Sequence, residues 1–173
     1  YELTVQEETY IFIDELIDRK DPSVKLANGG TQTHLYFTDS HKRDSVYAVL
    51  KKQEDKFTVL KKEEFPSRWH YQHDRVGDLL VEAKPGYYMR EGSRERFMKS
   101  AKIGSMMGVH GYDPDVTTDV RGIFYACGPN IKSGLTVAPF QNIHVYPLIA
   151  RILGLPLPKI DGKPEVLDKL YKK

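Results

Sequence analysis

A strand–helix–strand–strand pattern within residues 30–84 constrains the fold more than any other feature of the chain. Three short runs rich in apolar, β-branched and aromatic residues predict strands, and apolar residues at i, i+3 and i+4 predict one amphipathic helix. Asp39 and Ser40 stand before the helix, where side-chain oxygens cap free backbone N–H groups. In chain order these elements are the strand His34–Phe37, the helix from about Lys42 to Gln53, and the strands Phe57–Leu60 and Gly77–Ala83.

The flanking regions add further elements of both kinds. The segment Thr9–Leu16 begins as a strand and ends in an acidic turn, and Ile123–Ala126 is a near-continuous apolar run typical of a strand buried on both faces. Val145–Leu153 carries a strong helical stripe, which Gly154 ends, and Glu165–Leu170 predicts a short terminal helix. The sequence therefore predicts a mixed α/β fold in which helices pack on a layered sheet.

Composition excludes several classes of protein. The 26 Lys and Arg residues nearly balance the 24 Asp and Glu residues, which gives no basic patch for nucleic acid or anionic membranes. The one cysteine, Cys127, excludes an internal disulfide and a thiolate zinc site, and its place after an apolar run predicts a small buried residue. No apolar run approaches the roughly 18 residues of a spanning helix. Because Tyr1 opens the chain without a signal-peptide pattern, we expect a piece of a longer protein.

The segment Gly108–Asp113, Gly-Val-His-Gly-Tyr-Asp, is the most suggestive local sequence. Glycines beside His110 would let its imidazole approach a metal ion closely, although a solvated loop histidine fits the same pattern. A catalytic zinc needs about three protein ligands, and the other histidines are poorly placed to join His110. The chain alone therefore holds part of a site. No serine-hydrolase elbow and no glycine-rich phosphate loop occurs, so we assign no catalytic and no cofactor-binding residue.

Several segments, taken together and in order, resemble the type I phosphodiesterase/nucleotide pyrophosphatase family of the alkaline phosphatase superfamily. The beginning, Tyr10–Leu16, is similar to a strand that follows the family's Asp-His-Gly metal motif. The remaining matching segments are Asp74–Tyr87, Gly108–Asp113, Gly122–Pro129 and Pro139–Pro147 running into Ile152–Leu155.

The resemblance implies a hydrolase of phosphodiester or pyrophosphate bonds that uses two zinc ions and a Thr or Ser nucleophile. It implies that His110 is a zinc ligand, and that the other ligands and the nucleophile belong to an N-terminal half absent from this chain. We therefore expect no tightly bound zinc and no activity in this chain alone. Small phosphodiesters or nucleotides would be the substrates of the parent enzyme, and its location would be extracytoplasmic, with no nucleic-acid polymer as partner.

The resemblance also predicts how the chain is divided. Residues 1–27 would join the missing half, 28–89 would form a small inserted β-α-β-β cap, and 90–173 would complete a partial alkaline-phosphatase-like sheet. A non-catalytic role remains as an alternative. A degenerate homologue would act through contacts alone, and a ferredoxin-like nucleic-acid binder would stack bases on Tyr36, Phe37 and Phe57.

Overall fold

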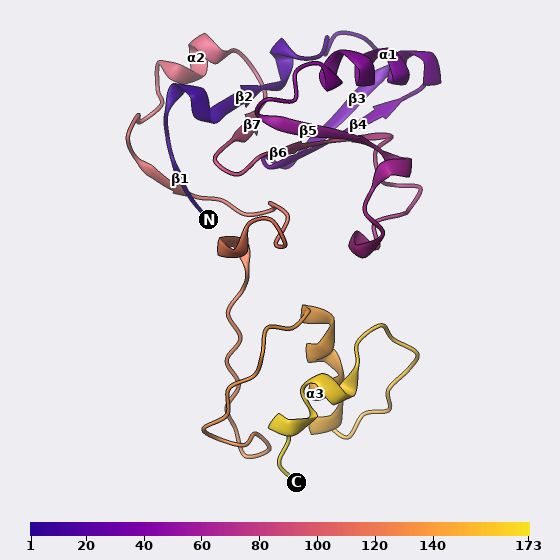
Figure 1. Cartoon of the computed structure of the whole chain (residues 1–173), viewed down its shortest axis with the longest axis vertical. Coiled ribbons are helices and arrows are strands. Elements are labelled where there is room, and N and C mark those ends of the chain that lie inside the picture. The colour runs from indigo at the N-terminus through magenta and orange to yellow at the C-terminus, as the bar shows by residue number, and fades with distance from the viewer. The chain divides into compact units, whose positions relative to one another are not determined.

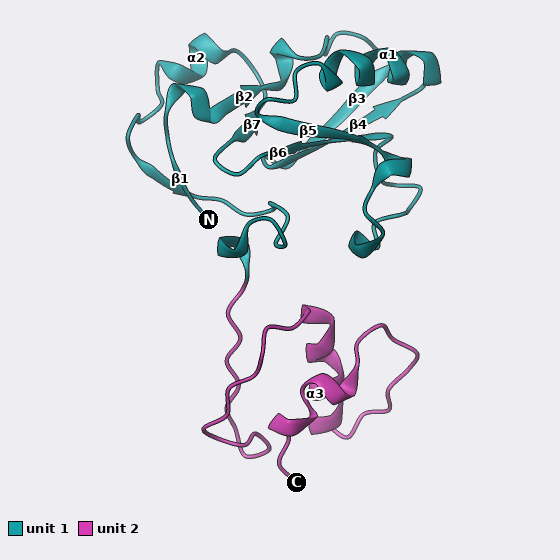
Figure 2. Ribbon diagram, in the orientation of Figure 1, with its two compact units in different colours: residues 1–121 teal, residues 122–173 magenta.

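The computed structural model describes all 173 residues and divides into two compact units, residues 1–121 and 122–173 (Figures 1 and 2). The larger unit contains a four-stranded antiparallel sheet in the order β3-β4-β6-β5. Its strands and helix are β3 Val24–Asn28, β4 Gln32–Phe37, α1 Ser40–Lys51, β5 Phe57–Lys61 and β6 Leu79–Ala83. The predicted strand–helix–strand–strand order is confirmed, and β3 is an additional strand that the sequence analysis did not identify.

Helix α1 begins where its capping residue predicts. The Asp39 carboxylate accepts a hydrogen bond from the backbone N–H of His41 at 2.8 Å, which satisfies one of the free donors of the first turn. Leu50, near the other end of the helix, is fully buried. The helix thus has a defined start and a fixed apolar contact with the core.

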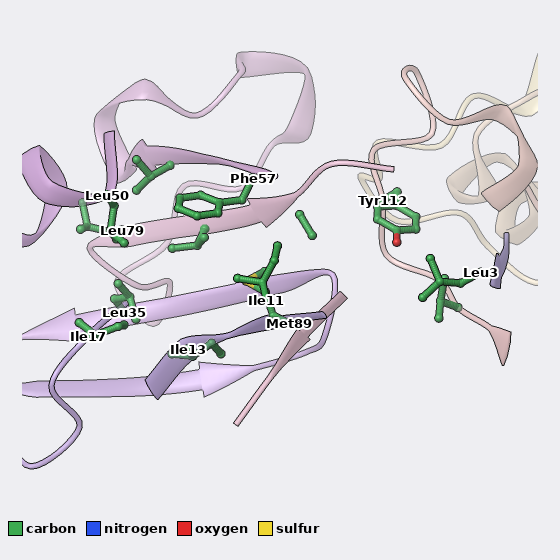
Figure 3. Packing of buried hydrophobic residues seen from close by; sticks show 14 residues of the cluster. Leu3, Ile11, Ile13, Ile17, Leu35, Leu50, Phe57, Leu79, Met89 and Tyr112 are labelled. Atoms are coloured by element: carbon green, nitrogen blue, oxygen red, sulfur yellow. The ribbon is translucent and has the colours of Figure 1, made fainter. Parts of the chain in front are cut away.

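One face of the sheet supplies most of the core of this unit. Leu35, Val59 and Leu79 alternate with residues of the opposite face and are fully buried. Figure 3 shows Ile11 and Met89, from two short strands outside the sheet, converging on the same cluster as Phe57. Each such side chain contributes about 1.5–3 kcal/mol when it leaves water, so this face stabilises the unit.

Two pairs of short strands extend the larger unit beyond the sheet. β1 Glu2–Thr4 pairs antiparallel with β8 Met106–Gly108, and β2 Tyr10–Phe12 pairs parallel with β7 Tyr88–Arg90. The five-residue helix α2 follows β7 and covers Arg94–Met98. These pairings bring the start of the chain beside the segment that follows β8.

The smaller unit is built around helix α3, Val145–Ile152. Its core residue Leu148 packs with Leu167 and Leu170. Gly154 lies beyond the helix in the left-handed conformation, as the sequence predicts. The predicted terminal helix forms two 3-10 turns instead, Pro164–Val166 and Asp168–Leu170.

The predicted buried strand Ile123–Ala126 is wrong. The segment pairs with no strand, and Ile123 and Tyr125 are 82% and 90% exposed. Cys127 is also exposed, which corrects its interpretation as a buried residue. A strand needs a neighbour for its backbone groups and apolar faces, and none is present beside this run.

The proposed base-stacking surface does not form. Phe57 is a core residue, and Phe37 packs on the same side of the sheet, whereas Tyr36 belongs to the opposite face. The three rings therefore share no exposed platform.

None of the helices combines the length and the apolar character of a membrane-spanning segment.

Candidate functional site

The segment that carries His110 follows directly from the end of β8. Val109 forms a backbone pair with the first residue of the chain: its N–H donates to the Tyr1 carbonyl at 3.0 Å, and its own carbonyl accepts from the Tyr1 amino group at 3.2 Å. Val109 and Tyr112 are buried, while His110 between them is exposed. Burial on both sides of the histidine fixes the backbone and directs its ring to solvent.

Gly111 is the glycine that this loop requires. Its φ of +98° lies in the left-handed region, and a side chain there would overlap the hydroxyl of Thr31. That hydroxyl donates to the carbonyl of His110 at 2.9 Å. Gly108, by contrast, has open space around its Cα, so only one of the two flanking glycines has a steric reason to be there.

Tyr112 anchors the loop from the inside. Its hydroxyl donates to the carbonyl of Tyr87 at 2.5 Å, and its ring packs edge-on against Tyr1 with the centroids 5.2 Å apart. It belongs to the main buried cluster (Figure 3). Burial raises the pKa of its phenol to about 12, so Tyr112 stays neutral and acts as a hydrogen-bond donor at physiological pH.

Asp113, whose side chain is buried, closes the loop with an ion pair to the partly exposed Arg68. Its two carboxylate oxygens accept from the two terminal nitrogens of Arg68, one of them at 3.0 Å, and from the indole N–H of Trp69 at 3.3 Å. It also accepts from the backbone N–H of Asp115 at 2.9 Å. The Arg68 guanidinium is the main reason that the pKa of this carboxyl is lowered.

His110 is the exception in this firmly held loop, because its ring is exposed and has no hydrogen-bond partner. A free imidazole nitrogen is a good zinc ligand. However, the structure contains no group of three or more His, Cys, Asp or Glu side chains close enough together to hold a metal ion. His110 is thus an exposed imidazole that belongs to no group of potential metal ligands within this chain.

Most of the other histidines have structural partners. The Nδ1 atoms of His73 and His144 accept from the backbone N–H groups of Arg75 and Lys163 at 3.1 and 2.9 Å. His34 contacts the hydroxyl of Tyr71 through Nε2 at 3.2 Å, and burial lowers its pKa.

His41 is exposed in the first turn of α1, and His70 has a left-handed backbone with φ of +48°. None of these histidines joins a metal-binding group.

Sequence reasoning missed Arg68, Trp69 and Thr31 as partners of this loop. Arg68 precedes Asp113 by 45 residues, and the Thr31 hydroxyl reaches across 79 residues to the His110 carbonyl. Neither pairing has a local signature in the sequence. A charged residue within the loop sequence could have pointed to Asp113, but nothing in the sequence indicates that Arg68 is its partner.

The sequence matches a known protein family. Residues 3–113 match the family described as Type I phosphodiesterase / nucleotide pyrophosphatase, a span that includes the His110 loop up to Asp113. A rat protein named ectonucleotide pyrophosphatase/phosphodiesterase family member 7 is 35% identical over 130 residues, which are 75% of this chain and 28% of the relative.

Solved structures share the fold of this chain. Human ectonucleotide pyrophosphatase/phosphodiesterase 5 superposes with a TM-score of 0.81 at 24% identity, over 99% of this chain and 43% of that structure. An inactive variant of the murine counterpart, in complex with AMP, superposes with a TM-score of 0.80 at 26% identity and with the same coverage. The chain therefore spans less than half the length of these relatives.

Proposed function

This chain belongs to the type I phosphodiesterase/nucleotide pyrophosphatase family, and on that premise we propose that it is the C-terminal portion of a hydrolase of phosphodiester or pyrophosphate bonds. The share of the relatives that it covers, 28% of the rat protein and 43% of the human structure, supports this interpretation. The Thr or Ser nucleophile and most metal ligands would then lie in the part of the family domain that this chain does not contain.

The observation that carries the proposal is the free ring of His110 in a loop that is held at every neighbouring residue. Val109, Gly111, Tyr112 and Asp113 are fixed by backbone pairing, close packing, a buried hydroxyl and an ion pair. Such a loop presents one imidazole at little entropic cost. We assign His110 as the zinc ligand that this chain contributes, where zinc would stabilise charge on the phosphoryl oxygens.

Exposed apolar residues of the smaller unit support the view that the chain is a portion of a longer domain. Helix α3 and its flanks bury one face in the unit but leave large apolar side chains in solvent on the other. These side chains are Ile143, Tyr146, Ile149 and Leu153. Several large apolar side chains exposed on one helix often mark a surface that another segment covers. In the proposed parent protein, the rest of the family domain would cover it.

The relatives suggest the substrate class and the location. The murine structure contains AMP, which favours a nucleotide or a small phosphodiester as substrate. The names of the relatives begin with ectonucleotide pyrophosphatase, which favours a location outside the cytoplasm. The subdomain of residues 28–89, which contains the strands β4, β5 and β6 of the four-stranded sheet, would serve as a cap beside the substrate site, between a joining segment 1–27 and the portion 90–173.

Hydrolysis of p-nitrophenyl phosphodiesters tests the proposal. We expect the chain alone to hydrolyse them no faster than buffer, with or without zinc, because it offers one of about three ligands that a zinc site requires. In the longer protein that carries this chain, His110→Ala should remove zinc-dependent turnover. His41→Ala, which removes another exposed imidazole from unit 1, should leave it intact.

Two results would contradict this division of the site, with His110 as one ligand and the other ligands outside this chain. Zinc-dependent turnover by the chain alone, lost in His110→Ala, would mean that the chain contains a complete site. Full zinc content and turnover of the longer protein after His110→Ala would remove His110 from the site. Zinc binding without turnover in the longer protein would instead favour the non-catalytic homologue.

A further inference from the structure

The ion pair between Arg68 and Asp113 joins two distant parts of the chain at the His110 loop. Arg68 and Trp69 lie in a 3-10 turn, Ser67–Trp69, within the connection from β5 to β6. Together they direct three N–H donors at one carboxylate whose side chain is only 8% exposed. A fork of two parallel N–H bonds fixes both the distance and the orientation of the partner.

The backbone after this turn is held in an uncommon conformation. His70 ends the turn with φ of +48°, and it is the only non-glycine residue of the chain with a positive φ. Such a conformation persists where the surrounding contacts determine it. Phe65 packs beside Trp69, with the ring centroids 6.0 Å apart, and so supports the indole from the side of the sheet. The turn is therefore shaped to present Arg68 and Trp69 together.

The charges around Asp113 make Arg68 difficult to replace. Asp115 also accepts from Arg68, at 2.7 Å, and the half-buried carboxyl of Glu82 is near enough to both Arg68 and Asp113 to be influenced by their charges. One guanidinium thus compensates a group of three acidic side chains. Without it, the buried Asp113 carboxylate would lose its ion-pair partner while the carboxyl groups of Asp115 and Glu82 remain nearby.

We propose that Arg68 and Trp69 are positioning residues for His110, which hold its loop through Asp113 in the geometry that presents the imidazole. The inference rests on the proposed role of His110 as a metal ligand. Neither residue contacts the ring, and their effect is transmitted along the loop from Asp113 to His110. The hydroxyl of Thr31 holds the carbonyl of His110 from the other side, so loss of the ion pair would free one side of the loop while the fold remains.

The first experiment measures the loop in this chain. Trp69 is the only tryptophan, so its fluorescence reports directly on the indole that binds Asp113. In Arg68→Gln we expect a red-shifted Trp69 emission and at least about tenfold faster amide exchange at residues 109–115. The matched control is Arg94→Gln, which breaks a similar two-bond pair, with Glu15 at 2.8 and 2.7 Å, elsewhere in the same unit. It should leave both measurements unchanged.

The second experiment measures zinc in the longer protein. We expect Arg68→Gln to weaken zinc binding by about tenfold, as loss of a group that orients a ligand does, and saturating zinc should restore turnover. Arg68→Lys keeps the positive charge but loses the two-bond fork. Its zinc affinity should therefore lie between that of Arg68→Gln and that of the unmodified protein. His110→Ala should not recover at any zinc concentration. A merely structural residue would change stability without this zinc-dependent recovery.

The outcomes separate this inference from the proposed function. If His110→Ala lowers zinc affinity while Arg68→Gln changes neither zinc affinity nor exchange of the loop, the positioning role is wrong and the ligand role stands. If His110→Ala leaves zinc binding unchanged, the proposed function itself fails. Trp69→Phe removes one hydrogen bond with little change of shape, so it tests the role by exchange and zinc affinity if Arg68→Gln does not fold.

Discussion

Thr31 and Gly111 fit so closely that the Thr31 hydroxyl occupies the space where a side chain of residue 111 would lie. The same hydroxyl donates to the carbonyl of His110 at 2.9 Å. The close approach and the hydrogen bond depend on each other, because a Cβ at position 111 would push the hydroxyl away from its acceptor. The backbone of the proposed metal ligand is thus set by a residue in the connection between β3 and β4 of the four-stranded sheet.

Gly111→Ala is expected to destabilise the larger unit by about 2–4 kcal/mol, because it adds a steric overlap to a strained left-handed φ. Urea unfolding followed by Trp69 fluorescence measures this change. Gly92→Ala is the matched control, since Gly92 has a similar φ of +92° but no atom within 4 Å of the added Cβ. It should lose only about 1 kcal/mol. If the two variants lose the same free energy of unfolding, the contact with Thr31 does not contribute to stability.

The Arg68–Asp113 pair is expected to make the stability of the larger unit depend on acid pH. Because Arg68 lowers the pKa of Asp113 below its unfolded value of about 3.9, the folded chain binds fewer protons than the unfolded chain at acid pH. The stabilisation is complete above pH 4 or so and is lost as pH falls toward the folded pKa.

Asp113→Asn should remove this part of the pH dependence and destabilise the unit by about 2 kcal/mol near pH 7. A series of urea unfolding curves between pH 7 and pH 3 measures both effects. Asp44→Asn removes an exposed carboxylate that pairs with Lys61 at 2.9 Å, so it should change the curves less. Full acid dependence in Asp113→Asn would show that the Arg68–Asp113 pair is not its source.

Tyr112 is expected to ionise late in an alkaline titration. Burial raises its pKa to about 12, against an ordinary value of about 10, so the folded chain retains a proton that the unfolded chain loses. Its contribution to stability is complete below pH 10 or so and is lost as pH rises toward 12.

The ultraviolet absorbance of the phenolates, compared between the chain and Tyr112→Phe, isolates this one group. The variant should lack the step near pH 12 and lose about 1 kcal/mol at pH 7, because the Tyr87 carbonyl loses its donor. A difference titration with a midpoint near pH 10 would mean that Tyr112 is not buried as described.

The sequence predicts those elements whose signals are local. Helix α1 starts after Asp39 because a cap and an apolar stripe agree over a dozen residues, and α3 ends before Gly154 for the same kind of reason. β3 was missed because Val24–Asn28 is a short edge strand with only moderate apolar character. Several short segments in the right order indicate the family, and no single residue could do so.

The contacts of the His110 loop were not predictable, because they join residues far apart in the chain. Nothing in the sequence around Arg68 or Thr31 indicates that Asp113 or His110 is its partner. The failure at Ile123–Ala126 has a different cause. Its composition is that of a buried strand, but burial depends on a neighbouring strand, and this chain places none beside it.

The exposed run at Ile123 and Tyr125 is expected to make the chain self-associate. Both side chains are large and almost fully in solvent, and their backbone is unpaired, which favours contact between copies. Burial of one such side chain contributes about 1.5 kcal/mol or more, which is roughly tenfold in an association constant. Ile123→Lys together with Tyr125→Thr should therefore weaken self-association by at least about tenfold.

Sedimentation velocity over a range of protein concentrations measures this association. Val116→Lys is the control, because Val116 is also exposed but lies outside the apolar run and in the other unit. It should leave the concentration dependence nearly unchanged. If the unmodified chain stays monomeric at all concentrations, the run does not mediate contact between copies of the chain.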